Sequence, residues 1–83
     1  MLLPGQVNKL KLADGEAVFR EGDVGDAAYL IESGSVVIRK EVEEGEMDLA
    51  TLLPGEFFGE MSIIDGSPRM ASAFACHETV LIK

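Results

Sequence analysis

Short apolar runs separated by turn residues limit most strongly how this chain can fold. The runs recur at spacings of roughly 8–12 residues, which is typical of an all-β sandwich or barrel. Glycine, aspartate, serine and proline stand between them. The sequence therefore predicts about six to eight short strands. The runs are Val7–Leu12, Glu16–Arg20, Ala28–Glu32, Val36–Lys40, Met47–Leu53, Ala71–Cys76 and Thr79–Lys83.

The residues between these runs predict where the chain reverses direction. Ser33–Ser35 separates two apolar runs and predicts a tight hairpin turn. The acidic stretch Glu41–Glu46 predicts a solvated hairpin tip. Glu60–Ile64 breaks the β pattern, because good helix formers follow Gly59 and turn residues at Asp65–Pro68 end the segment. One short helical turn is expected there, lying between strands.

One short pattern occurs twice in the chain. A Gly-Glu pair followed closely by phenylalanine appears as Gly15-Glu16 with Phe19 and as Gly55-Glu56 with Phe58. Such an echo is expected where two β halves pack as a jelly roll. We therefore predict a mainly β fold, a double-stranded β-helix or jelly-roll barrel, with one short helix.

Length and charge indicate one small acidic domain. The chain has 83 residues, which is enough for a single domain covering residues 1–83. Its formal net charge is −8, and the seven lysine and arginine residues are scattered along it. A protein that binds the backbone of DNA or RNA needs a clustered positive surface, so no direct nucleic-acid binding is expected.

Cysteine content and hydropathy bear on the compartment. Cys76 is the one cysteine, so an internal disulfide cannot form. This fits a reducing, cytoplasmic setting. The sequence contains no secretory signal, and no apolar run approaches the roughly 20 residues of a membrane span. We therefore expect a cytoplasmic protein that does not insert into a membrane.

Catalysis has few residues to draw on in this chain. A metal-dependent cupin, built on a related double-sheet barrel, needs a cluster of histidine and carboxylate ligands. His77 is the one histidine, and it stands near the end of the chain among small residues. No serine or cysteine has a base partner that the sequence identifies. The sequence therefore predicts a binding module with no catalytic residues, no metal site and no cofactor.

The segment from Gly59 to Ala71 combines groups that suit a ligand with hydroxyls on one side and negative charge on the other. Glycine lets the backbone approach a ligand closely, and free N–H groups in the first helical turn suit an anionic oxygen. Arg69 can hold a phosphate through two parallel hydrogen bonds, each worth about 1.5–3 kcal/mol. Glu60 can accept a hydrogen bond from a ribose hydroxyl. A simple ion pair between Glu60 and Arg69 across the loop is the alternative.

The same segment resembles the phosphate-binding cassette of the cyclic-nucleotide-binding domain family. That family includes regulatory subunits of cyclic-AMP-dependent kinase, the catabolite activator protein and cyclic-nucleotide-gated channels. Phe58–Ser62, then Pro68-Arg69 and Ala71, match the cassette in order and spacing. Further matches extend over nearly the whole chain, at Gly15-Glu16 with Phe19, Glu21–Asp23, Gly25-Asp26, Tyr29–Ile31, Gly34–Val36 and Pro54–Gly59.

The resemblance implies a role for each residue of the segment. Glu60 would accept a hydrogen bond from the ribose 2′-hydroxyl, and Gly59 would permit the close approach of the sugar. Arg69 would hold the cyclic phosphate. Backbone amides would complete the cradle around that phosphate, and they belong to Met61, Ser62, Met70 and Ala71. The implied ligand is a cyclic nucleotide.

The chain departs from the family pattern in two places. Met70 stands where the family often carries Ser, Thr or Ala, and a Ser or Thr hydroxyl there can reach the phosphate and, in guanine-preferring members, also the base. Methionine has no such donor, which favours cyclic AMP over cyclic GMP, and its bulk is expected to crowd the pocket. The sequence stops at Lys83, before the family's C-terminal helices that cover the base. Apolar surface would then be exposed, and we expect a homodimer.

Two functions are compatible with these features. The first is a sensor module that binds cyclic AMP and regulates a linked or partner effector, whose identity the sequence does not specify. The second is a family member that no longer binds nucleotide and serves as an interaction or oligomerisation domain. Met70 and the missing helices favour this second function. Titration with cyclic AMP and cyclic GMP separates the two.

Overall fold

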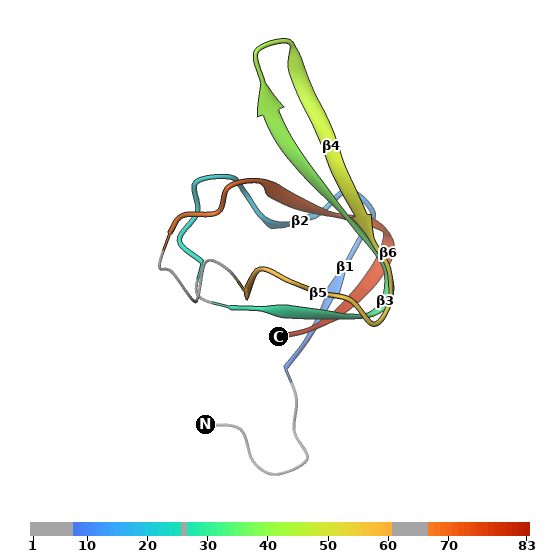
Figure 1. Cartoon of the computed structure of the whole chain (residues 1–83). Coiled ribbons are helices and arrows are strands. Elements are labelled where there is room, and N and C mark those ends of the chain that lie inside the picture. The colour runs from blue at the N-terminus through green and yellow to red at the C-terminus, as the bar shows by residue number, and fades with distance from the viewer. Residues whose placement is uncertain (1–7, 26, 61–66) are drawn as a thin grey trace.

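Strands account for most of the residues that the computed structural model describes, which are residues 8–25, 27–60 and 67–83. The strands are β1 (Lys9–Leu12), β2 (Ala17–Phe19), β3 (Tyr29–Val42), β4 (Gly45–Leu52), β5 (Phe57–Phe58) and β6 (Ser72–Ile82). They form one antiparallel sheet in the order β1-β6-β3-β4, with β2 paired to β6 and β5 paired to β3. Figure 1 shows this sheet curling on itself, with the β3–β4 hairpin projecting beyond it. The mainly β prediction is confirmed.

Alternate side chains of the strands fill the interior of the curled sheet. In β3, Tyr29 and Ile31 are buried, whereas Leu30 between them is only half-buried. Phe19, Tyr29 and Phe58 form an aromatic cluster whose ring centroids lie 5.3 to 6.2 Å apart. Rings at these separations attract one another. The cluster therefore gives the barrel a rigid aromatic wall.

The tight hairpin turn predicted at Ser33–Ser35 is wrong. β3 runs through this stretch as one strand and pairs with β6 on both sides of it. Gly34 adopts a φ of 82° and shifts the register of that pairing, which makes a bulge and not a turn. A Cβ at Gly34 would lie 2.5 Å from the Glu78 carbonyl oxygen and 2.7 Å from the Thr79 Cα atom. Glycine here lets β6 pack directly against β3.

The two runs predicted at the end of the chain, Ala71–Cys76 and Thr79–Lys83, also form one strand, β6, and not a separate pair. The strand is irregular at His77, whose φ of 66° lies in the left-handed region. The His77 backbone N–H donates to the Asp14 carboxylate at 2.6 Å, which holds this irregular residue in place. Turn-forming residues in this chain therefore mark bulges within long strands as well as reversals between short ones.

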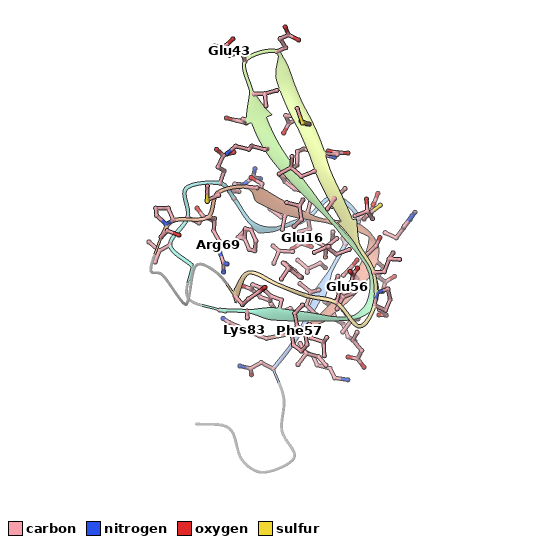
Figure 2. The ribbon with its side chains drawn as sticks, in the orientation of Figure 1. Glu16, Glu43, Glu56, Phe57, Arg69 and Lys83 are labelled. Atoms are coloured by element: carbon pink, nitrogen blue, oxygen red, sulfur yellow. The ribbon has the colours of Figure 1, made fainter. Side chains whose placement is uncertain are left out.

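The acidic stretch Glu41–Glu46 lies at the tip of a hairpin, as predicted. β3 and β4 pair as far as Val42 opposite Gly45, which leaves a two-residue turn at Glu43 and Glu44. Every residue of the stretch is exposed, and Figure 2 shows Glu43 at the far end of the hairpin. The carboxylates are therefore solvated.

Helices contribute little to the described part of the chain. The helical turn predicted at Glu60–Ile64 lies, apart from Glu60, outside the described residues. Among residues 8–25, 27–60 and 67–83, no helix has the length and apolar character needed to cross a bilayer.

Three four-residue turns share one design, and two of them carry the repeated Gly-Glu pattern. The third residue of each is a glycine with φ between 83° and 92°, as a type II turn requires. The N–H of the fourth residue donates to the carbonyl of the first at 3.0 to 3.1 Å. The acidic side chain of the fourth residue accepts from the N–H of the first at 2.6 to 3.0 Å. The turns are Ala13–Glu16, Arg20–Asp23 and Leu53–Glu56.

Each of these turns is clipped to one residue of a neighbouring segment. The glycine N–H donates to the carbonyl of that residue, and the carbonyl of the fourth turn residue accepts from its N–H. The first turn holds Ala75 in this way, and the third holds Ile31. The turn Arg20–Asp23 holds Arg69, with both bonds at 2.8 Å. The same pair of backbone hydrogen bonds that holds two strands of the barrel therefore also holds the backbone of Arg69, the residue predicted to bind phosphate.

Candidate functional site

A hollow of about 410 Å³ lies beside the segment that the sequence singled out. This volume is within the roughly 300–1,000 Å³ of small-molecule sites. Gly59, Glu60, Arg69, Met70 and Ala71 all line it, together with aromatic and aliphatic side chains of the barrel. The structure therefore brings the described members of the predicted site to one place.

Arg69 is held inside the molecule in a fixed orientation. The residue is only 4% exposed. Its Nη1 donates to the Gly59 carbonyl at 2.6 Å, and its Nη2 donates to the Ala27 carbonyl at 2.7 Å. Its Cζ atom lies 4.1 Å from the centre of the Phe19 ring, close enough for a cation–π interaction. Figure 2 shows the side chain reaching from the segment before β6 toward the end of β5.

Among residues 8–25, 27–60 and 67–83, no carboxylate pairs with Arg69. Both of its hydrogen bonds go to backbone carbonyls, and no ion pair joins it to Glu60. The simple ion pair considered as an alternative is therefore not formed. Its Nε is buried and has no hydrogen-bond partner within the described residues. A buried donor without an acceptor costs about 1–3 kcal/mol, so an oxygen acceptor that reached this atom would stabilise the site.

Gly59 is needed for a reason that the sequence alone did not indicate. Its φ is 87°, and a Cβ there would lie 2.8 Å from the Arg69 Nη1 atom and 3.2 Å from the Ala27 carbonyl oxygen. From the sequence, we expected the missing side chain at Gly59 to leave space for a ligand. In the structure this room is taken by the Arg69 guanidinium.

The other predicted site residues differ in how far the structure describes them. Glu60 is exposed and lines the hollow. Met70 also lines the hollow, but the residue is 75% exposed, so its bulk does not fill the pocket as expected. Ala71 is half-buried. Met61 and Ser62 lie outside the described residues.

Sequence reasoning missed three residues that shape the site. Ala27 supplies a carbonyl to Arg69, and Phe19 supplies the ring beneath its guanidinium. Lys40 donates from its Nζ to the Met70 carbonyl at 2.7 Å. A side-chain pattern cannot indicate which backbone carbonyl will accept a hydrogen bond, so Ala27 could not be identified. Lys40 could not be identified because it is 30 residues away from Met70 in the sequence. The place of Phe19 in the repeated Gly-Glu pattern was the one signal that could have pointed to it.

Comparisons with known proteins agree on one family. A family model described as "Cyclic nucleotide-binding domain" matches residues 9–83. The cyclic AMP receptor protein of Thermus thermophilus is 46% identical over 69 residues, which cover 82% of this chain and 32% of that protein. The cAMP-dependent protein kinase type II regulatory subunit of Drosophila melanogaster is 36% identical over 62 residues, covering 75% of this chain and 16% of the subunit.

Solved structures agree in fold as well. The catabolite activator protein of Thermus thermophilus superposes with a TM-score of 0.85 at 42% identity, over 92% of this chain and 36% of that one. The EAL enzyme Bd1971, solved in cyclic-AMP-bound and cyclic-GMP-bound forms, gives 0.86 at 39% identity, over 92% of this chain and 21% of the enzyme. The jelly-roll prediction is confirmed by this likeness. The chain spans about a third or less of the length of these proteins.

Proposed function

Since the chain belongs to the cyclic-nucleotide-binding domain family, we propose that it is a sensor module that binds cyclic AMP in the hollow beside Arg69. The observation that carries this proposal is the buried Arg69 guanidinium. Among the described residues it has no carboxylate partner, and its Nε is unpaired. A cyclic phosphodiester presents two exocyclic oxygens that share one negative charge. A planar fork of N–H donors is well matched to such a group.

We assign the remaining contacts by their place around the hollow. Glu60, which is exposed and lines it, accepts a hydrogen bond from the ribose 2′-hydroxyl. Gly59 contributes by leaving room for the Arg69 guanidinium, which a side chain at this position would displace. The phosphate cradle is completed by backbone amides of Met61, Ser62, Met70 and Ala71.

The charge of the whole chain works against an anionic ligand, so binding must depend on local donors. The net charge is −8, and a field of that sign lowers the concentration of anions near the surface. Arg69 is buried, and electrostatic interactions are stronger and less screened by salt there than at the surface. One buried arginine therefore provides most of the attraction.

We propose cyclic AMP as the preferred ligand and cyclic GMP as the weaker one. Met70 lines the hollow without a hydroxyl that could select guanine. Relatives named above carry cyclic AMP in their names, and one neighbour has been solved with either nucleotide. Comparison of the two nucleotides is therefore part of the test.

We propose that the module regulates a linked or partner effector in the cytoplasm and has no catalytic role. The relatives named above include a receptor, a kinase regulatory subunit and an EAL enzyme, each much longer than this chain. Within the described residues, no group of three or more histidine, cysteine or acidic residues could hold a metal ion. The expected homodimer stays a prediction.

The direct test is isothermal titration of the chain with cyclic AMP, cyclic GMP and 2′-deoxy cyclic AMP, using the parent and Glu60→Gln. The parent is expected to bind cyclic AMP more tightly than cyclic GMP. Glu60→Gln is expected to weaken cyclic AMP by on the order of 10-fold, because it loses a charged acceptor. The 2′-deoxy analogue should not distinguish the two proteins. No heat with either natural nucleotide at high protein concentration would instead support the interaction or oligomerisation role.

Gly59→Ala is expected to weaken cyclic AMP binding by about 10-fold or more, because the new Cβ displaces the Arg69 guanidinium. Gly55→Ala is the matched control, since Gly55 has a similar φ of 92° but a Cβ there would meet no atom within 4 Å. Both variants carry the same kind of backbone strain. Equal loss of affinity in the two, measured by titration calorimetry, would show that contact with Arg69 is not the cause.

A further inference from the structure

Lys40 reaches from β3 to the segment that carries the proposed phosphate ligands. Its Nζ donates to the Met70 carbonyl at 2.7 Å and lies 3.3 Å from the Glu21 carboxylate. Alternate residues of a strand share a face, so Lys40 is on the same face of β3 as Ile38, which lines the hollow. The ammonium therefore stands beside the site while its bonds go to protein atoms.

Glu21 connects the same ammonium to the backbone of Arg69. The Glu41 backbone N–H and the Lys40 ammonium hold the pKa of the Glu21 carboxyl below its usual range. Its own N–H donates to the Ser72 hydroxyl at 2.8 Å. Glu21 belongs to the turn Arg20–Asp23, which holds Arg69 by two backbone bonds. The Lys40 side chain therefore bonds Met70 directly, and through Glu21 it is also connected to the turn that holds Arg69.

The bond to the Met70 carbonyl fixes more than one atom. A trans peptide is planar, so the Met70 carbonyl and the Ala71 N–H lie on opposite edges of one rigid plane. Holding the carbonyl sets the direction of that N–H. Ala71 lines the hollow, and its amide is one of those assigned above to the phosphate cradle.

We propose that Lys40 is a positioning residue for the phosphate-binding segment. Its ammonium orients the Met70–Ala71 peptide, and Glu21 keeps the ammonium in place. This inference rests on the proposed function, because it concerns how the same site is prepared for its ligand. Lys40 acts through the peptide and does not contact the nucleotide.

A second ion pair of the chain provides a matched control. Lys9 lies 3.0 Å from Glu32, and its side chain is 48% exposed, compared with 39% for Lys40. Neither Lys9 nor Glu32 lines the hollow. Because exposed ion pairs contribute little to stability, both Lys40→Gln and Lys9→Gln are expected to stay folded.

The test compares Lys40→Gln, Lys40→Arg and Lys9→Gln by titration calorimetry with cyclic AMP. Lys40→Gln is expected to weaken binding by about 3- to 10-fold, as loss of one hydrogen bond would. The affinity of Lys9→Gln for cyclic AMP should stay within about 2-fold of that of the parent. Lys40→Arg should keep most of the parent's affinity, because arginine also carries a charged donor. The loss in Lys40→Gln should persist at about 0.5 M salt, where a simple attraction between ammonium and nucleotide is screened.

A measurement on the free protein makes the outcome independent of affinity. The Ala71 amide resonance is expected to move in Lys40→Gln and to stay in place in Lys9→Gln. A parent that binds cyclic AMP, with equal affinity and an unmoved Ala71 resonance in Lys40→Gln, would overturn the positioning role and leave the proposed function intact. A parent that binds no cyclic nucleotide would overturn both.

Discussion

Arg69→Gln is expected to lower the affinity for cyclic AMP by at least about 100-fold, which in a weak binder means no detectable heat. The guanidinium is the buried cation of the site, and it can give the phosphate two charge-assisted hydrogen bonds worth about 1.5–3 kcal/mol each. Glutamine keeps a donor for one of the two carbonyls but has no charge and no fork. Titration calorimetry against the parent measures the loss.

Arg69→Lys separates charge from geometry in the same experiment. Lysine keeps the positive charge but presents a single flexible ammonium, so an intermediate affinity is expected. Because Arg69 also bonds the carbonyls of Gly59 and Ala27, each variant must first be shown to fold, by its amide NMR spectrum. A folded Arg69→Gln that binds within about 3-fold of the parent would remove Arg69 from the site.

Gly34→Ala is expected to destabilise the chain by about 2–5 kcal/mol. The left-handed backbone costs a non-glycine residue about 1–2 kcal/mol, and forcing a methyl group into packed atoms costs about 1–3 kcal/mol more. At Gly34 the φ is 82°, and the neighbours of the new Cβ are Glu78 and Thr79 of β6. Total stability for a domain of this size is only about 5–10 kcal/mol, so much of it would be lost.

Gly15→Ala is the control for this prediction. Gly15 has a φ of 83°, but a Cβ at this position would have open space around it, with no atom within 4 Å. It should therefore lose only the backbone part, about 1–2 kcal/mol. Urea unfolding followed by circular dichroism measures both variants. Equal midpoints would show that β6 does not pack closely against Gly34.

The sequence was sufficient to predict most of the strands, but it missed the short strand β5 and the continuity of β3 and β6. Short apolar runs with regular spacing correctly indicated a mainly β barrel, and the acidic stretch correctly indicated the hairpin tip at Glu43 and Glu44. Gly34 and His77 interrupt the pattern in the same way that a turn would. Whether such a residue makes a turn or a bulge depends on the strand it meets, which lies more than 40 residues away in the chain.

The lining of the hollow was predictable where it consists of polar side chains with a recognisable chemistry. Glu60 and Arg69 were found from their residue types and from the family resemblance, and both line the hollow. The Ala27 carbonyl could not be found in this way, since every residue has one and only the fold selects it. Lys40 was equally hidden, because nothing near it in the sequence indicates a partner on the segment before β6.

The repeated Gly-Glu pattern proved more informative than its two occurrences suggested. Its turns, Ala13–Glu16 and Leu53–Glu56, have the same internal bonds as Arg20–Asp23, where aspartate replaces glutamate and no phenylalanine follows. That third turn clips to Arg69. The three turns therefore share a glycine followed by an acid, and the segment that carries Arg69 is held by the same kind of turn as two strands of the barrel.

NMR titration of the isotopically labelled chain with cyclic AMP, following the Arg69 Nε–Hε signal, tests the central proposal most directly. This donor is buried and without a partner among the described residues of the free protein. The predicted result is saturable binding of cyclic AMP with a large change in this signal. Cyclic GMP is expected to produce the same change only at a higher concentration. An Arg69 signal that does not change at saturating cyclic AMP would contradict the proposal.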